Sequence, residues 1–155
     1  MKPASVAILK KELKNLSQEE LLSLTTKLAA FKIDNKAYLS YLLFHQETPD
    51  LYLELLKNDF QESFEAINQD SSFYVRKGLR KIERELNKQA KYMKDKGAHV
   101  ELLSYFLHLF KTIISVHHQQ VLHKIFDRIL LKTQNMIPLL HEDLQYDYHR
   151  YIDKL

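Results

Sequence analysis

The sequence predicts an all-α protein of seven or eight helices. Only two glycines and three prolines occur among 155 residues, so the chain has few of the residues that let a backbone reverse tightly. Apolar residues recur at spacings of three and four, as on one face of a helix. The length matches one domain, and a hydrophobic fraction of 45% suffices for a core. We expect residues 1–155 to form a single domain, either a compact multi-helical bundle or a short α-solenoid of helical hairpins.

The first two helices are predicted from a start signal and a periodic pattern. A short helix covers about residues 4–14. Ser17 and Glu20 then have the spacing of a capping box, in which each side chain bonds the other residue's backbone amide. The second helix begins there. Its apolar face holds Leu21, Leu24, Leu28 and Phe31.

Asp34 is expected to cap a third helix that runs to Phe44. Thr48 and Pro49 repeat the start signal, with threonine at the cap and proline at the first helical position. The fourth helix extends to about residue 69. Its apolar stripe holds Tyr52, Leu56, Phe60, Phe64 and Ile67.

A strongly two-faced helix is predicted over about residues 72–96, ending at Gly97 as a left-handed terminator. One sector is apolar, with Val75, Leu79, Ile82, Leu86 and Met93. The opposite sector, here called the basic face, holds Lys77, Lys81, Arg84, Lys88 and Lys91. Gly78 lies inside this helix, where glycine costs about 1 kcal/mol relative to alanine, so we expect close packing at that position.

The next helix, about residues 98–116, is apolar around most of its circumference and is therefore expected to be the buried central helix. One thin polar stripe runs along it through Glu101, Ser104, His108, Lys111 and Ser115. The apolar face then rotates by nearly half a turn, which places a turn at residues 117–120. A further helix runs to Met136. After a boundary at Pro138, the last helix presents Leu140, Leu144, Tyr148, Tyr151 and Leu155.

The positive charge of the chain is concentrated in one segment. Residues 76–96 contain nine lysines and arginines against three acidic residues, a local charge of +6, whereas the whole chain carries +3. The basic face predicts a non-enzymatic protein–protein interaction module that binds an acidic protein partner. Contact with nucleic-acid phosphates through the same stripe stays open, although no base-reading motif occurs.

Catalytic, cofactor-binding and metal-binding residues are not predicted. The chain has no cysteine, no phosphate-binding glycine loop and no nucleophile elbow. Its eight histidines lack metal-ligand spacing. His141-Glu142 begins an H-E-x-x-H pattern, but Gln145 stands where the second histidine belongs. The pair His123 and Asp127 supplies only two ligands, and His141, Gln145 and His149 merely share a helix face. His117 and His118 fall in the predicted turn, where polar residues are expected.

Tyr146 lies off the apolar face of the last helix and is the candidate interface residue at this end of the chain. Tyr148 and Tyr151 align with Leu144 and are instead expected to complete the core. No hydrophobic signal-peptide region or membrane span is expected, because the longest apolar stretch is short and contains His108 and Lys111. We expect a cytoplasmic protein without membrane contact.

Three stretches carry a family resemblance: residues 10–21 (KKEL and LSQEEL), residues 42–44 (LLF) and residues 141–148 (HEDLQYDY). In these the chain resembles an uncharacterised family of small all-helical proteins from Bacteroidetes-type bacteria. The resemblance implies a cytoplasmic all-helical domain. It implies no catalytic residue, because the family has no assigned activity.

Overall fold

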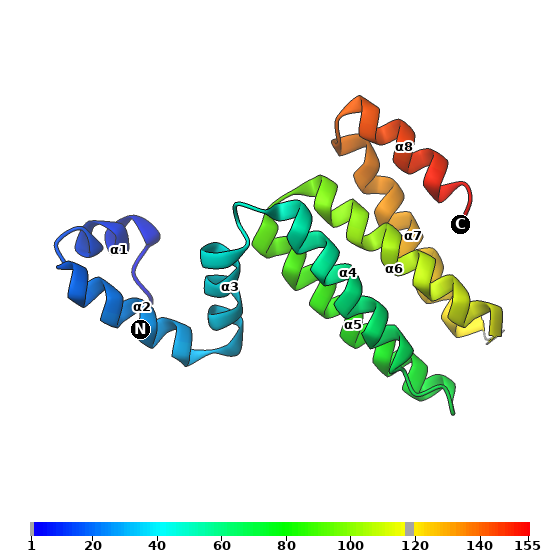
Figure 1. Cartoon of the computed structure of the whole chain (residues 1–155), viewed down its shortest axis with the longest axis horizontal. Helices are drawn as coiled ribbons and strands as arrows, with labels where there is room; N and C mark the ends of the chain where they lie inside the picture. The colour runs from blue at the N-terminus through cyan, green and yellow to red at the C-terminus, as the bar shows by residue number, and fades with distance from the viewer. Residues whose placement is uncertain (1, 117–119) are drawn as a thin grey trace. The chain divides into compact units, whose positions relative to one another are not determined.

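The computed structural model describes residues 2–116 and 120–155 (Figure 1). These residues form eight α-helices and one short 3₁₀ helix, with no strand, which confirms the all-α prediction. Backbone contacts divide the chain into two compact units, residues 1–46 and residues 47–155. The single domain expected over residues 1–155 stays a prediction.

The first unit contains α1 (Val6–Leu13), α2 (Gln18–Phe31) and α3 (Ile33–Phe44). The predicted capping box is present at the start of α2. The Glu20 amide donates to Ser17 Oγ at 3.3 Å, and the Ser17 amide donates to Glu20 Oε2 at 2.7 Å. These two bonds satisfy backbone donors that a helix start leaves without intrahelical partners.

The predicted Asp34 cap of α3 is wrong. Only Lys32, in an extended conformation, separates α2 from α3, so α3 begins at Ile33 and Asp34 lies within its first turn. The side-chain amide of Asn35 reaches back and donates to the Leu28 carbonyl at 2.8 Å. This bond satisfies a carbonyl at the end of α2 and allows the two helices to meet almost directly.

Tyr41 is the one buried side chain among the described residues of the first unit. The predicted apolar face of α2 is exposed: the exposed fractions are 61% for Leu28 and 76% for Phe31. Helical periodicity therefore locates these helices correctly, but their apolar faces lack the burial seen in the second unit.

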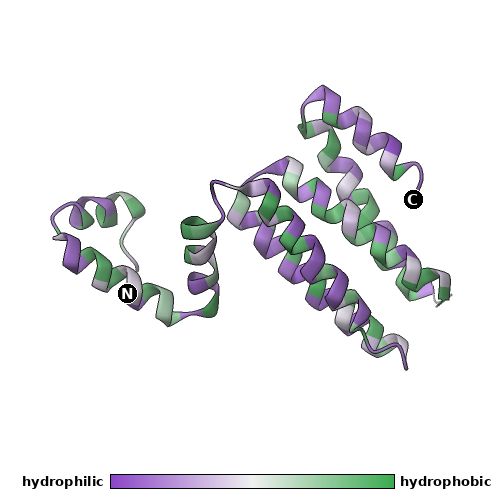
Figure 2. Ribbon diagram, in the orientation of Figure 1, coloured by the Kyte–Doolittle hydropathy of each residue, from purple (hydrophilic) through white to green (hydrophobic). Residues whose placement is uncertain are grey.

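The second unit contains α4 (Pro49–Glu65), α5 (Ser72–Met93), α6 (Lys96–Val116), α7 (Gln120–Met136), the 3₁₀ helix η1 (Ile137–Leu139) and α8 (Glu142–Ile152). Pro49 occupies the first turn of α4 as predicted, but the Thr48 side chain at the cap position makes no capping hydrogen bond. Helix α6 packs against α4, α5, α7 and α8, which surround it as a bundle (Figure 1). It is the central helix that its nearly uniform apolarity predicts (Figure 2).

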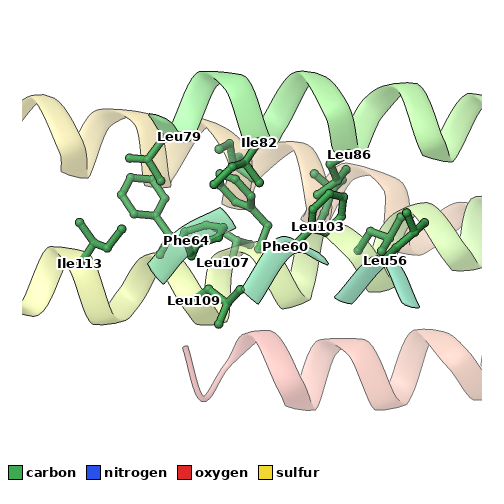
Figure 3. Packing of buried hydrophobic residues seen from close by; sticks show 14 of the residues in the cluster. Leu56, Phe60, Phe64, Leu79, Ile82, Leu86, Leu103, Leu107, Leu109 and Ile113 are labelled. Carbon is green, nitrogen blue, oxygen red and sulfur yellow. The ribbon is translucent and has the colours of Figure 1, made fainter. Parts of the chain in front are cut away.

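The core of the second unit lies between α6 and its neighbours. Leu79, Ile82 and Leu86 of α5 point toward the α4 and α6 side chains (Figure 3). A row of edge-to-face aromatic contacts links α4 to α7 through α6. Its ring centroids are 5.1 to 5.9 Å apart, in the order Phe64, Phe106, Phe110 and Phe126. Such contacts add stability beyond the burial of apolar area.

The predicted terminator Gly97 is wrong. Helix α5 ends three residues earlier, where Lys94 adopts the left-handed conformation with φ of 55°. Asp95 then begins α6, because its Oδ1 accepts a hydrogen bond from the Ala98 amide at 2.9 Å. Gly97 consequently lies in the first turn of α6. The aspartate cap outweighs glycine as the boundary signal at this position.

Close packing at Gly78 is confirmed. A Cβ at this position would lie 2.9 Å from Cγ1 of the buried Ile67, closer than such atoms approach one another. Glycine therefore allows the segment after α4 to pack directly on the α5 backbone.

The predicted turn at residues 117–120 falls largely outside the described residues, which exclude His117, His118 and Gln119. Helices α6 and α7 end and begin on either side of it, at Val116 and Gln120, and pack against each other. The rotated apolar pattern is accounted for, since Leu122 and Ile129 are fully buried.

Candidate functional site

The basic face lies along α5, opposite the buried sector of that helix. Lys77, Lys81, Arg84 and Lys91 are exposed, whereas Lys88 is partly buried. The Lys88 ammonium lies 2.6 Å from Glu85 Oε2, one turn earlier on the helix. Four of the five predicted cations are thus exposed to a partner.

Two glutamates flank the cations of α5, one at each edge of the charged sector. At one edge, Glu83 accepts two hydrogen bonds from the Arg128 guanidinium of α7, at 2.9 and 2.7 Å. At the other, Glu85 binds Lys88 and also accepts from the Gln89 amide at 2.6 Å. Glu83 is therefore paired with a residue outside the basic face, whereas Glu85 offsets the charge of Lys88 within it. The other four cations of the face keep their positive charge.

Two further arginines, Arg76 and Arg80, belong to this surface and were missed from the sequence because they lie at the rim of the chosen sector. With Lys77, Arg84 and Phe73 they line a surface cavity of about 730 Å³ on the side of α5 nearest Glu83. Their spacing of four residues, continued by Arg84, is the signal that could have revealed them.

The other side of the basic face has a mixed charge. There Lys77, Lys81 and Arg84 share a cavity of about 790 Å³ with acidic residues of α4. The acidic side chains are Asp59 and Glu62, both exposed. The surface around α5 is therefore cationic toward α7 and mixed toward α4.

Beside Glu83, a polar cluster joins α5, α6 and α7. The Lys132 ammonium donates to Asn87 Oδ1 at 2.6 Å, and His99 Nε2 lies 3.1 Å from the same oxygen. Burial, together with the nearby Lys132 charge, lowers the pKa of His99 to about 4. Burial also lowers the pKa of Lys132, although the Glu83 charge opposes that shift. This cluster places a neutral imidazole next to an ammonium at the edge of the cationic surface.

Tyr146 is 69% exposed, in keeping with its predicted position off the packed face of α8. Tyr148 packs against the core, whereas Tyr151 and Leu144 stay 38% and 42% exposed. The expectation that both tyrosines complete the core is thus met by Tyr148 alone.

Within the residues that the structure describes, no three His, Asp or Glu side chains come together as a group able to hold a metal ion. His123 is exposed, and His141 lies 3.4 Å from the Asp143 carboxylate.

Comparison with protein-family models, curated proteins and solved structures gives no match for this chain. The small all-helical fold implied by the family resemblance is present, and membership of that family stays a proposal. Among the described helices, none has the length and apolarity needed to cross a membrane.

Proposed function

We propose that this chain is a non-enzymatic interaction module that binds an acidic segment of a protein partner through the basic face of α5. The observation that carries this proposal is the pairing of the flanking glutamates. Glu83 is held by Arg128 and Glu85 by Lys88, so neither neutralises the exposed cations between them. The exposed cations of the basic face attract carboxylates and speed the association of an acidic partner with this surface.

The surroundings of the basic face favour a protein over a continuous phosphate backbone. Asp59 and Glu62 border it on the α4 side and would repel phosphates there. At the start of α5, Phe73 and Tyr74 are 60% and 48% exposed and pack edge to face at 5.5 Å. Exposed aromatic area beside arginine and lysine is typical of protein interfaces.

A nucleic-acid-binding protein is the second candidate, and a different observation favours it. Arg76, Arg80 and Arg84 follow one another at single-turn spacing along the cavity on the α7 side. Arginine binds phosphate with two parallel hydrogen bonds, so such a row could follow a strand of DNA or RNA.

A charge-matched pair of variants tests the proposal. In the first, Lys77, Lys81, Arg84 and Lys91 are all changed to glutamine. In the second, four exposed lysines of the first unit are changed instead: Lys10, Lys11, Lys14 and Lys27. Both lose four positive charges, so only the position of the charge differs. Each is used as bait in the native host, and the captured material is treated with nuclease.

We expect the wild type and the first-unit variant to retain an acidic partner protein after nuclease treatment, and the α5 variant to lose it. Direct titration with a fluorescent single-stranded oligonucleotide at about 50 and 200 mM salt tests the nucleic-acid-binding function. Phosphate contacts weaken steeply over that range of salt. Salt-dependent oligonucleotide binding that the α5 variant alone loses would establish the nucleic-acid function instead. Equal retention of the acidic partner by both variants would refute the basic face as its binding surface.

We also propose that the chain belongs to the family it resembles and that it is cytoplasmic. The binding role of α5 depends on neither of these proposals.

A further inference from the structure

The polar stripe along the central helix α6 opens onto a cavity of about 450 Å³. Its wall is built from three helices: α4 supplies Lys57, α6 supplies Glu101, Ser104 and Tyr105, and α8 supplies Leu144, Asp147, Tyr148 and Tyr151. The cavity volume falls in the range typical of small-molecule sites. It lies apart from α5 and its basic face, since no α5 residue contributes to the wall.

Ser104 is the polar group on this wall that the fold leaves unsatisfied. Its side chain is 3% exposed, and within the described chain its Oγ has no hydrogen-bond partner. A buried hydroxyl without a partner costs about 1–3 kcal/mol. A polar group kept at such a cost beside a cavity is a natural contact for a bound molecule.

The charges on the wall leave one carboxylate uncompensated. Lys57 Nζ lies 2.7 Å from both Glu54 and Glu101, so the only lysine of the wall is already surrounded by two carboxylates. Asp147 is exposed at the cavity and forms no ion pair among the described residues. The cavity thus carries net negative charge and repels anions.

Three tyrosines complete the wall. Burial, reinforced by the Glu101 carboxylate, raises the pKa of Tyr148 to about 12. The Tyr105 hydroxyl donates to Gln61 Oε1 at 3.1 Å, which holds that ring in place. Aromatic rings attract cations through their π faces, most strongly where water is excluded.

We propose that this cavity binds a small organic ammonium ion. The ammonium group donates to the Asp147 carboxylate and lies against the tyrosine rings. The Ser104 hydroxyl gains its missing hydrogen bond from a polar group of the ligand. This site is independent of the proposed partner surface on α5.

Three probes that share one ring and differ in charge test the proposal on the full-length protein. They are 2-phenylethylammonium, the neutral 2-phenylethanol and the anionic 3-phenylpropanoate. Binding is followed by two-dimensional amide NMR at fixed salt. Small probes of this size bind with dissociation constants of about 1 mM when a site fits them. We expect saturable shifts on α4, α6 and α8 with the ammonium probe, and weaker binding of the other two.

Asp147→Asn is expected to raise the dissociation constant of the ammonium probe about fivefold, the size of one partly exposed charge interaction. Asp153→Asn removes the same charge from the exposed end of α8, outside the cavity wall, and should leave that constant unchanged. Both positions are exposed, so neither variant threatens the fold. Equal binding of the three probes, equal effects of the two variants, or no saturable shift would each overturn the proposal.

Discussion

Arg128 of α7 donates two parallel hydrogen bonds to the Glu83 carboxylate of α5, from Nη1 to Oε1 at 2.9 Å and from Nη2 to Oε2 at 2.7 Å. The two partners differ in exposure: 56% of the Arg128 side chain is exposed but only 15% of the Glu83 side chain. The Glu83 carboxylate therefore has little water around it and relies on Arg128 for its hydrogen bonds, whereas the exposed guanidinium can bind water instead. The pKa of Arg128 is raised by these hydrogen bonds to Glu83.

This asymmetry predicts unequal mutational costs. Arg128→Gln is expected to lower the free energy of unfolding by about 1–2 kcal/mol, because it strands a largely buried carboxylate. Glu83→Gln should cost only about 0.5 kcal/mol, since the released guanidinium is hydrated. Urea unfolding measures both values. Lys124→Gln, at an exposed site one turn before Arg128, is the control. Equal losses for the two partners would contradict the asymmetry.

Gly78→Ala is expected to destabilise the protein despite the better helix propensity of alanine. The new methyl group would meet Ile67 Cγ1 at 2.9 Å and Cγ2 at 3.3 Å, and Ile67 is itself buried. Overpacking typically costs 1–3 kcal/mol and alanine regains about 1 kcal/mol, so we expect a net loss of about 1 kcal/mol.

The sign of this effect should reverse when Ile67 is shortened. In an Ile67→Ala background the space is free, and Gly78→Ala should then stabilise by about 0.5–1 kcal/mol. Thermal unfolding of the four proteins of this cycle gives the coupling energy. A loss of stability in both backgrounds would mean that contact with Ile67 does not explain the glycine.

The sequence was sufficient to predict the helices and, in the second unit, the side of each helix that faces the core. Periodicity placed α5 and α6 within a few residues and identified α6 as central. It failed where two local signals competed, as at Asp95 and Gly97, and where a helix began after a one-residue link, as at Ile33. Periodicity also does not predict whether an apolar helix face is buried, since the apolar face of α2 is exposed.

The candidate sites were harder to predict because they depend on contacts between distant segments. The five cations of the basic face share one helix, so spacing alone brought them together. Glu83 and Arg128 are 45 residues apart in the sequence, and no local pattern predicts their pairing. The cavity beside Ser104 likewise needs three helices. The polar stripe of α6 gave the one hint of it, as polar residues on an otherwise buried helix.

Ser104→Ala is expected to stabilise the unliganded protein. The substitution removes a buried hydroxyl that has no partner in the described chain and introduces the best helix former. A gain of about 1 kcal/mol corresponds to a rise in melting temperature of about 2–4 °C for a protein of this size. Ser115→Ala is the matched control on the same helix, because Ser115 is exposed and its Oγ donates to the Thr112 carbonyl at 2.7 Å. A lower melting temperature for Ser104→Ala would show that the hydroxyl is satisfied in solution.

His99 should make the fold sensitive to mild acid. In the folded protein its Nε2 faces Asn87 Oδ1 with the Lys132 ammonium close by, and burial together with that charge lowers its pKa from 6.5 to about 4. The unfolded chain therefore takes up this proton first as the pH falls. The stability that the neutral His99 contributes is fully present above about pH 6.5, is lost as the pH falls from about 6.5 to 4, and changes no further below that range.

Because His99 is only half buried, solvent screening limits the expected loss to about 1–2 kcal/mol. The measurement is the difference in unfolding free energy between pH 7 and pH 4.5, compared with His99→Gln. That variant keeps a side-chain donor but cannot take up the proton, so its stability should fall less over the same interval. His123→Gln, at an exposed position on α7, should follow the wild type. If His99→Gln also follows the wild type, other groups dominate the acid response and His99 is not its source.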